Sequence, residues 1–285
     1  MRCMKMTTTT TTNELVYKSP DIKHDKGFVY VASLIPSYYE FSLLSAQSLR
    51  DHYPEANITL FTHQDFVDGR AERLFDEIRV GIPHSRRAKM WCMARTPYDV
   101  TLYNDVDSLV RRSKIKKVFD QIKNYDMAFG SNLDYTVADP ELVYADTNHE
   151  HKIIHHGSLC LYHKSDLNLE FHQTWYDEYI KQLSAPWEYD WADPVWKKYD
   201  MHTLWRLMSN NESRFDRYQK IKIKLLERHW NNTFIDRKQD LNEPPIITQL
   251  NRTFISGINE YQKSIDRNIN YYEKKKKTEN SGVFS

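Results

Sequence analysis

The chain has 285 residues, of which 28% are charged, and its formal net charge is +1 at pH 7. This balance excludes the strong basic field that favours nucleic-acid binding, so no nucleic-acid partner is expected. No apolar stretch approaches the roughly 20 residues that a transmembrane helix needs. The three cysteines lack metal-ligand spacing, and no Gly-rich phosphate loop occurs among only 7 glycines. Together these features predict a soluble, cytoplasmic protein.

Composition divides the chain into a leader, one large domain and a tail. Residues 1–25 contain a run of threonines and few apolar residues, which is typical of a disordered leader. Residues 259–285 are polar and include four consecutive lysines, so we expect a solvated basic tail. The intervening residues 26–258 are long enough for a single domain with a large core.

Apolar runs alternate with helical spacings along this domain. Strands are predicted at residues 28–34, 58–62, 77–80, 100–104, 127–130, 158–162 and 221–226. Helices are predicted at residues 38–50, 86–94, 115–122 and 166–183, with a further helix ending near residue 208. Because strands and helices alternate, the sequence predicts an α/β fold with a largely parallel sheet flanked by helices. Residues 131–153 lack periodicity and are predicted to form a long functional loop.

The most informative motif is Asp105-Val106-Asp107, which directly follows the strand predicted at residues 100–104. In an extended segment alternate side chains point the same way, so Asp105 and Asp107 are expected to present two carboxylates to one place. Carboxylate oxygens suit Mg²⁺ or Mn²⁺, and such a cation commonly neutralises a diphosphate. Open α/β sheets bind their ligands at the carboxyl ends of strands. We therefore predict a metal site for a nucleotide-activated substrate, although solvated aspartates in a turn are the alternative.

A lysine near this motif is the second candidate. Lys89 lies sixteen residues before Asp105, at the start of a predicted helix beside the same strand. A lysine in that position could contact a phosphate as a point charge, whereas the alternative is an ordinary surface lysine.

Residues 87–110 resemble the core of nucleotide-sugar glycosyltransferases of the GT-A fold, in the style of the glycogenin and galactosyltransferase (family 8-like) group. The resemblance is carried by Lys89, a short helix and the pattern Tyr98-x-x-x-Leu102-Tyr103-x-Asp105-x-Asp107. It implies a Rossmann-like nucleotide-binding half at about residues 26–130 and an acceptor half at about residues 131–258. The first strand and helix are similar to the opening of that family. By position, Ala32 and Ser33 would contact the base or ribose, Tyr38 would stack on the base, and Val106 would line the donor site.

Two further stretches carry the resemblance. His156-Gly157-Ser158 is similar to the family's Asn-Ser-Gly stretch, so Gly157 and Ser158 are expected beside the donor sugar. Asp200 begins a stretch similar to the family's Asp-Gln helix start, whose aspartate faces the reacting sugar. His156 and Met201 depart from the family's Asn and Gln.

The family's third metal ligand is a C-terminal histidine for which this chain has no matching motif. His229 is the best candidate for that ligand, and a packed histidine is the alternative reading. The stretch at residues 244–249 is another candidate location, with Thr248 in place of the histidine.

The resemblance implies a metal-dependent glycosyltransferase that uses Mn²⁺ or Mg²⁺ and a nucleotide-sugar donor, with a UDP-sugar favoured. The acceptor would be a saccharide, a protein or a lipid-linked molecule. Asp200 and Lys89 would be its catalytic residues, and the stereochemistry would be retaining. A general base at Asp200 or Asp193 would indicate inversion instead. Two alternatives stay open: a haloacid-dehalogenase-like phosphatase that uses the Asp-x-Asp pair, and a nucleotide-sugar-binding protein without turnover.

Overall fold

The computed structural model describes residues 11–131, 155–186, 194–208, 212–233 and 244–249. The strands are β1 Glu14–Lys18, β2 Lys26–Val31, β3 Ile58–Phe61, β4 Glu77–Val80, β5 Val100–Asn104, β6 Ser108–Val110, β7 Met127–Ser131, β8 His155–His163, β9 Ile223–Leu225, β10 Asn232–Thr233 and β11 Ile247–Gln249. The α-helices are α1 Pro36–His52, α2 Ala71–Leu74, α3 Ala88–Met93, α5 Asp166–Ser184 and α6 Asp200–Met208. Shorter 3₁₀ segments are η1 Gln64–Phe66, η2 Ser113–Ile122, η4 Pro194–Lys198, η5 Ser213–Lys220 and η6 Arg228–Trp230.

An eight-stranded sheet in the order β1-β4-β3-β2-β5-β8-β7-β9 forms the centre of the protein. Its middle strands β4, β3, β2 and β5 run parallel to one another, and β8 pairs antiparallel with both β5 and β7. A second sheet of three strands, in the order β10-β11-β6, lies beside it. The predicted α/β fold with a mostly parallel, mixed central sheet is therefore confirmed.

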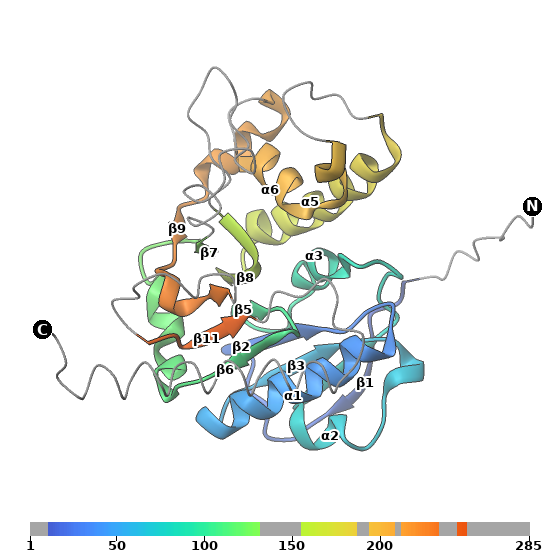
Figure 1. The fold of residues 1–285 in the computed structure, drawn as a ribbon, viewed down its shortest axis with the longest axis vertical. Coiled ribbons are helices and arrows are strands. Elements are labelled where there is room, and N and C mark those ends of the chain that lie inside the picture. The colour runs from blue at the N-terminus through green and yellow to red at the C-terminus, as the bar shows by residue number, and fades with distance from the viewer. Residues whose placement is uncertain (1–10, 132–154, 187–193, 209–211, 234–243, 250–285) are drawn as a thin grey trace, which may run out of the picture.

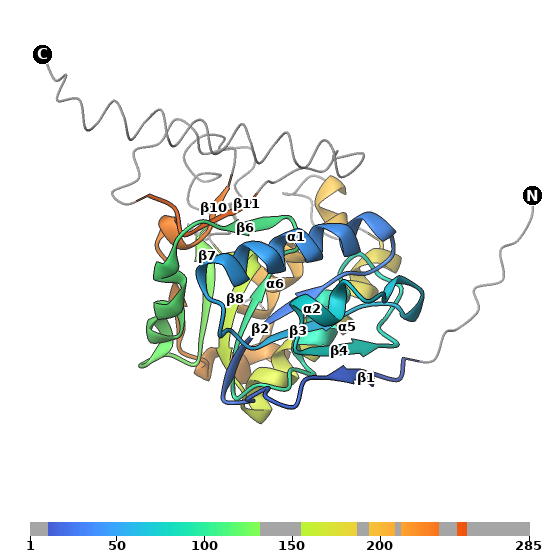
Figure 2. The same cartoon turned by 90° about the horizontal axis from the view of Figure 1, so that it is seen from below.

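The two faces of the central sheet pack into two separate cores. Along β2, Phe28 and Tyr30 belong to the core that includes α1, whereas Val29 and Val31 belong to the core that includes α3, α5 and α6. Figures 1 and 2 show these helices on opposite sides of the sheet. Strands buried on both faces read as continuous apolar runs, which is why this strand was recognisable in the sequence.

Structure begins earlier than the sequence predicted. Residues 1–25 were expected to form a disordered leader, but β1 pairs antiparallel with the edge strand β4 within that range. Leu15 and Val16 on β1 are 44% and 38% exposed, so backbone pairing rather than burial defines this strand. Hydropathy therefore gave no signal for it. The helix predicted at residues 115–122 also differs in type, because η2 is a 3₁₀ helix rather than an α-helix. Its buried residues Ile115, Val118 and Ile122 have a spacing that fits either kind of helix.

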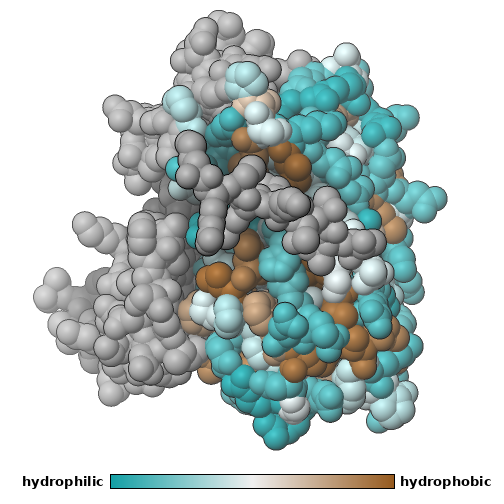
Figure 3. All heavy atoms as spheres, turned by 90° about the vertical axis from the view of Figure 1, so that its right-hand side faces the viewer, coloured by the Kyte–Doolittle hydropathy of each residue, from teal (hydrophilic) through white to brown (hydrophobic). Residues whose placement is uncertain are grey.

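In the described part of the chain, no helix combines the length and apolar character needed to cross a membrane. Figure 3 shows one face of the protein, on which hydrophobic atoms occur in groups interspersed with hydrophilic ones.

Candidate active site

The sheet topology brings three distant segments to one edge. β2 and β5 are parallel and in register from Lys26 opposite Val100 to Val29 opposite Tyr103, so their carboxyl ends lie together. β8 runs antiparallel to β5, which places its first residues at that same edge. The hydroxyl of Ser33 donates to the carbonyl of Ser85 over 2.7 Å and joins the segment after β2 to the segment after β4. Ligands of open α/β sheets bind at such an edge.

Asp105 is the most highly connected carboxylate at this edge. Its backbone N–H donates to the carbonyl of Ser158 over 2.9 Å, which continues the pairing of β5 with β8. The hydroxyl of Tyr103 donates to its Oδ1, and the side-chain amide Nε2 of Gln249 lies 3.3 Å from its Oδ2. These contacts hold the carboxylate in one orientation, as ligand-binding carboxylates require.

Asp107 lies close enough to Asp105 for the two negative charges to interact. Burial, followed by the charge of Asp105, raises the pKa of Asp107 to about 7, against opposing effects from Lys89 and a hydrogen bond from Gln249. Val106 and Asp107 lie in a turn between β5 and β6 rather than in an extended segment, and the convergence of the two carboxylates stays a prediction that the interaction of their charges supports. Two adjacent carboxylates that repel each other are a donor set that a divalent cation stabilises.

Lys89, at the start of α3, is buried rather than on the surface, with only 5% of the residue exposed. Its Nζ donates to the carbonyl oxygen of Gly157 over 2.7 Å and lies 3.1 Å from Asp200 Oδ2 and 3.6 Å from Asp105 Oδ1. An ammonium group has three donors, and these three oxygens surround it. Lys89 therefore joins the Asp-x-Asp segment to the start of α6 and holds the carboxylates of Asp105 and Asp200 near each other.

Asp200 is buried and carries two cationic partners. Arg87 Nε lies 2.9 Å from its Oδ1, while Lys89 contacts its Oδ2. Burial alone would raise the pKa of Asp200, but the positive charges of Arg87 and Lys89 outweigh it and leave the pKa below its ordinary value. The Trp175 indole donates to the Asp200 carbonyl over 2.9 Å and fixes the start of α6. Asp200 is consequently an ionised carboxylate at neutral pH.

The first residues of β8 lie beside Lys89 and Asp105, which contact the carbonyls of Gly157 and Ser158. A Cβ on Gly157 would stand 3.0 Å from the Trp175 ring and 3.4 Å from Asp200 Oδ2, so the absence of a side chain allows this close packing. Asn231 donates to the hydroxyl of Ser158 over 3.1 Å, and Ser158 also hydrogen-bonds the His156 ring. Burial lowers the pKa of His156 to about 4, so this residue is neutral at pH 7.

The residues expected to contact the nucleobase are placed with varying exposure. Ala32, Ser33 and Val106 are buried. Tyr38 is partly buried and packs beside the core formed with α1. Their contacts to a nucleotide stay predictions.

His229 is not gathered with the two aspartates. Its Nδ1 lies 3.2 Å from Glu227 Oε2, and its ring packs against Trp230 with the centroids 5.5 Å apart. Within the described residues, no three His, Cys, Asp or Glu side chains form a cluster that could hold a metal. The role of His229 as third ligand therefore has no support in this arrangement.

The alternative location, at residues 244–249, does reach the site. β11 pairs antiparallel with β6, and Gln249 lies opposite Ser108. Thr248 lies opposite Leu109, while it is the neighbouring Gln249 that contacts Asp105. Whether Thr248 takes the place of the histidine stays a prediction, and the contact with Asp105 comes from Gln249.

Sequence reasoning assigned no role to Arg87, Tyr103 or Gln249. Arg87 stands two residues before Lys89 and Tyr103 two residues before Asp105, so proximity to the motif was an available signal for both. Gln249 is 144 residues from Asp105, and no local pattern marks it. Asp193 and almost all of the predicted loop at residues 131–153 lie outside the described residues.

Solved structures with a similar fold include glycosyltransferases. The galactosyltransferase LgtC, crystallised with donor and acceptor sugar analogues, matches with a TM-score of 0.50 and 13% identity, over 80% of this chain and 87% of LgtC. The glycosyltransferase GlyE of Streptococcus pneumoniae TIGR4 matches with a TM-score of 0.54 and 12% identity, over 84% of this chain and 60% of GlyE. The sequence matches no protein-family model and no curated protein. The expected GT-A fold is therefore confirmed by structure, while at this level of identity the likeness establishes the fold alone.

Proposed function

We propose that the protein is a glycosyltransferase that moves a sugar from a nucleotide-diphosphate donor to an acceptor, with a divalent cation held by Asp105 and Asp107. The observation that carries this proposal is the cluster of Arg87, Lys89, Asp105 and Asp200 at the carboxyl edge of β2 and β5. Asp107 lies close enough to Asp105 for their charges to interact. Mn²⁺ or Mg²⁺ suits this set because carboxylates are hard oxygen ligands. A UDP-sugar is the expected donor, and a saccharide, protein or lipid-linked molecule the expected acceptor.

The cation, when bound, would stabilise the negative charge that develops on the departing nucleoside diphosphate. The protein supplies fixed charges around that event. Lys89 keeps Asp105 and Asp200 in place, and Arg87, whose side chain is 30% exposed, is the cation of this cluster with access to a ligand. Charges that are held in advance of the reaction, in a site shielded from water, contribute strongly to catalysis.

The environment of Asp200 bears on stereochemistry. An inverting enzyme needs a general base, and an efficient base has a pKa near the operating pH. The pKa of Asp200 lies below its ordinary value and both of its oxygens contact cations, so Asp200 is a weak base. A carboxylate of this kind is better suited to stabilising positive charge on a sugar than to removing a proton. This supports the retaining reaction.

Thermal shift in Mn²⁺ against a series of nucleotide sugars tests donor binding, since a ligand that binds the native state raises the melting temperature. The donor that gives the largest shift is then used to measure transfer or donor hydrolysis by wild type and by Asp107→Asn. We expect turnover to fall at least about 100-fold, as happens when a charge-stabilising group is removed.

Unchanged turnover in Asp107→Asn would reject the metal assignment. Release of phosphate from simple phosphate esters, without any response to nucleotide sugars, would favour the phosphatase. Specific donor binding without turnover in any acceptor mixture would favour a binding protein.

A further inference from the structure

β1 is the last strand on one side of the central sheet, and it exposes apolar side chains there. In the strand order it pairs with β4 alone, so among the described residues no strand lies along its outer backbone edge. Figure 2 shows β1 at the margin of the sheet. Leu15 and Val16 on this strand are 44% and 38% exposed. An exposed edge strand with apolar side chains is a template on which another strand can pair.

Two features of β1 restrict which strand can pair with it. Glu14 and Lys18, at its two ends, are charged and exposed. The register with β4 shifts between Leu15 and Tyr17, which indicates a bulge. Charges and bulges are the usual protections of a sheet edge, and a bulge bends the strand and shortens the segment that pairs regularly. The charges oppose any strand that brings like charges opposite them, so this edge favours a short strand of complementary sequence.

The sequence of β1 is complementary to itself. It reads Glu-Leu-Val-Tyr-Lys, with opposite charges at its ends and apolar residues between them. In an antiparallel pair with a two-fold axis at Val16, Glu14 lies opposite the partner's Lys18, and Leu15 lies opposite the partner's Tyr17. Opposite charges and apolar side chains directly across a strand pair both stabilise it. A parallel pair in register would instead bring glutamate opposite glutamate and lysine opposite lysine, which is destabilising.

We propose that β1 is the contact surface for a second copy of this chain, paired antiparallel about Val16 in a symmetric dimer. Two-fold contacts, in which the same surface of both copies meets itself, are by far the commonest in soluble oligomers. Backbone hydrogen bonds along the edge supply affinity, and the side chains supply specificity. Three strands, β4, β3 and β2, separate β1 from β5, so this proposal does not rest on the carboxylate site or on the proposed function.

Sedimentation equilibrium of the whole protein over a range of concentrations tests the contact. We expect a monomer–dimer equilibrium for wild type. Leu15→Lys places a charge opposite the partner's Tyr17, and symmetry repeats this change at the other end of the contact. The dissociation constant should therefore rise at least about 10-fold. Leu183 on α5 offers a matched control, because it is 42% exposed. Leu183→Lys should leave the dissociation constant unchanged.

Exchange of the two charges tests the register. Glu14→Lys alone sets lysine opposite lysine at both ends of the contact, and Lys18→Glu alone sets glutamate opposite glutamate. Each variant by itself should dimerise at least about 10-fold more weakly than wild type. An equimolar mixture of the two variants restores both pairs of opposite charges and should associate as tightly as wild type. The double variant Glu14→Lys/Lys18→Glu, whose net charge equals that of wild type, should do the same.

Recovery in the mixture would also show that β1 stays folded in both single variants. A wild-type protein that remains monomeric at every concentration would overturn the proposal. A dimer that Leu15→Lys leaves unchanged would place the contact elsewhere and would overturn it as well. If Leu15→Lys weakens the dimer but neither the mixture nor the double variant recovers it, the antiparallel pairing about Val16 is wrong.

Discussion

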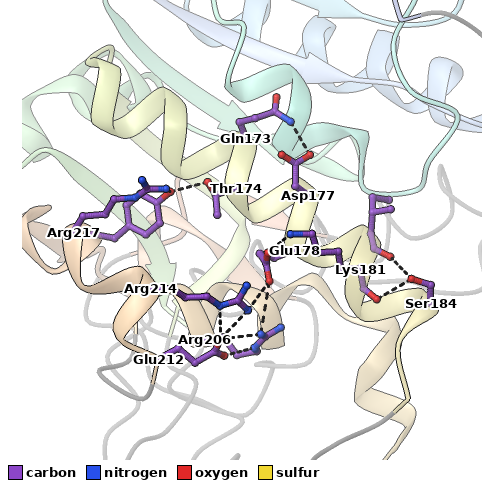
Figure 4. A network of polar contacts seen from close by, with 12 residues as sticks. Gln173, Thr174, Asp177, Glu178, Lys181, Ser184, Arg206, Glu212, Arg214 and Arg217 are labelled. Carbon is purple, nitrogen blue, oxygen red and sulfur yellow. Dashed lines mark hydrogen bonds and ion pairs between the residues drawn. The ribbon is translucent and has the colours of Figure 1, made fainter.

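Two clusters of buried charge in this protein differ in how they meet water. The site cluster, defined as Arg87, Lys89, Asp105 and Asp200, links α3 and α6 to the carboxyl end of β5. The scaffold cluster, shown in Figure 4, joins α5, α6 and η5 and consists of Glu178, Lys181, Arg206, Glu212 and Arg214. Both are built on an inaccessible carboxylate, Asp200 in one and Glu178 in the other.

Two of the three cations of the scaffold cluster extend into solvent, whereas the side chain of Arg206 is 14% exposed. The side chains of Lys181 and Arg214 are 68% and 51% exposed, and they lie 2.7 and 2.8 Å from Glu178 oxygens. In the site cluster the side chains of Lys89 and Asp200 are 6% and 3% exposed, and those of Arg87 and Asp105 are 30% and 20% exposed. Coulomb interactions are weak and screened by salt at the surface and much stronger where water is excluded. The scaffold cluster therefore joins helices, whereas the site cluster maintains an electric field that water screens only weakly.

Removal of Lys89 should have the largest effect. Lys89→Met leaves Asp105 and Asp200 close together without the cation between them. Breaking a buried ion pair in this way costs about 3–5 kcal/mol of stability, and we expect turnover to fall by about 100-fold or more. Urea unfolding and donor turnover measure the two effects.

Lys123 gives the control, since it is exposed and pairs with Asp120 one helical turn away. Lys123→Met should change stability by less than about 0.5 kcal/mol. A similarly small change in Lys89→Met would contradict the distinction between the two clusters.

Neutralisation of the scaffold carboxylate should separate stability from activity. Glu178→Gln retains shape and one acceptor oxygen but removes the charge facing Lys181, Arg206 and Arg214. We expect a loss of about 1–3 kcal/mol in unfolding free energy, the usual cost of weakening buried hydrogen bonds to charged groups. Donor affinity and turnover should stay within about twofold of wild type, because Glu178 contacts no member of the site cluster in the described structure. Loss of turnover in a folded variant would show that the clusters are coupled.

A buried base without an ionic partner extends the comparison. His172 on α5 is fully buried, neither ring nitrogen has a hydrogen-bond partner among the described residues, and burial lowers its pKa from 6.5 to about 3. The unfolded chain therefore binds a proton at a higher pH than the folded protein does. Stability from this group is complete above pH 6.5 and declines as the pH falls toward 3.

At pH 5 the expected loss from His172 is about 2 kcal/mol, at 1.36 kcal/mol for each pH unit. Chemical unfolding of wild type and His172→Gln between pH 7 and pH 5 measures it. The decline with acid should be smaller in the variant. Equal slopes would mean that His172 gains a partner for its proton.

The smallest effect is expected at the edge of the scaffold cluster. Lys181→Met removes an exposed lysine that pairs with Glu178 at i,i+3 spacing. Exposed pairs of this kind contribute about 0.3–0.5 kcal/mol. Unfolding at low salt and at high salt should show a small difference that high salt removes, whereas Lys89→Met should show a large difference at both. A cost above about 2 kcal/mol for Lys181→Met would place the scaffold cluster in the same class as the site cluster.

Much of the site could be predicted from sequence because its signals are local. The apolar run of β5 ends directly before Asp105, and Asp107 follows in the turn between β5 and β6. The buried strand β2 and the start of α3 at Lys89 can likewise be predicted from a few consecutive residues. Asp200 was recognised through its resemblance to a known helix start rather than from spacing.

What the sequence by itself determined is where most of the buried strands and the longer helices lie and where the acidic pair stands. Only the tertiary structure decided that β1 pairs at the sheet edge, that Lys89 contacts both Asp105 and Asp200, and that Gln249 rather than His229 stands beside the aspartates. Apolar periodicity reports which face of a segment is buried, and this follows from neighbouring residues. The contact of the Lys89 side chain with the Gly157 carbonyl, 68 residues away, and that of Asp105 with the Gln249 side chain, 144 residues away, depend on strand order and register. Strand order and register are set by packing of the whole chain, so no short stretch of sequence reveals them.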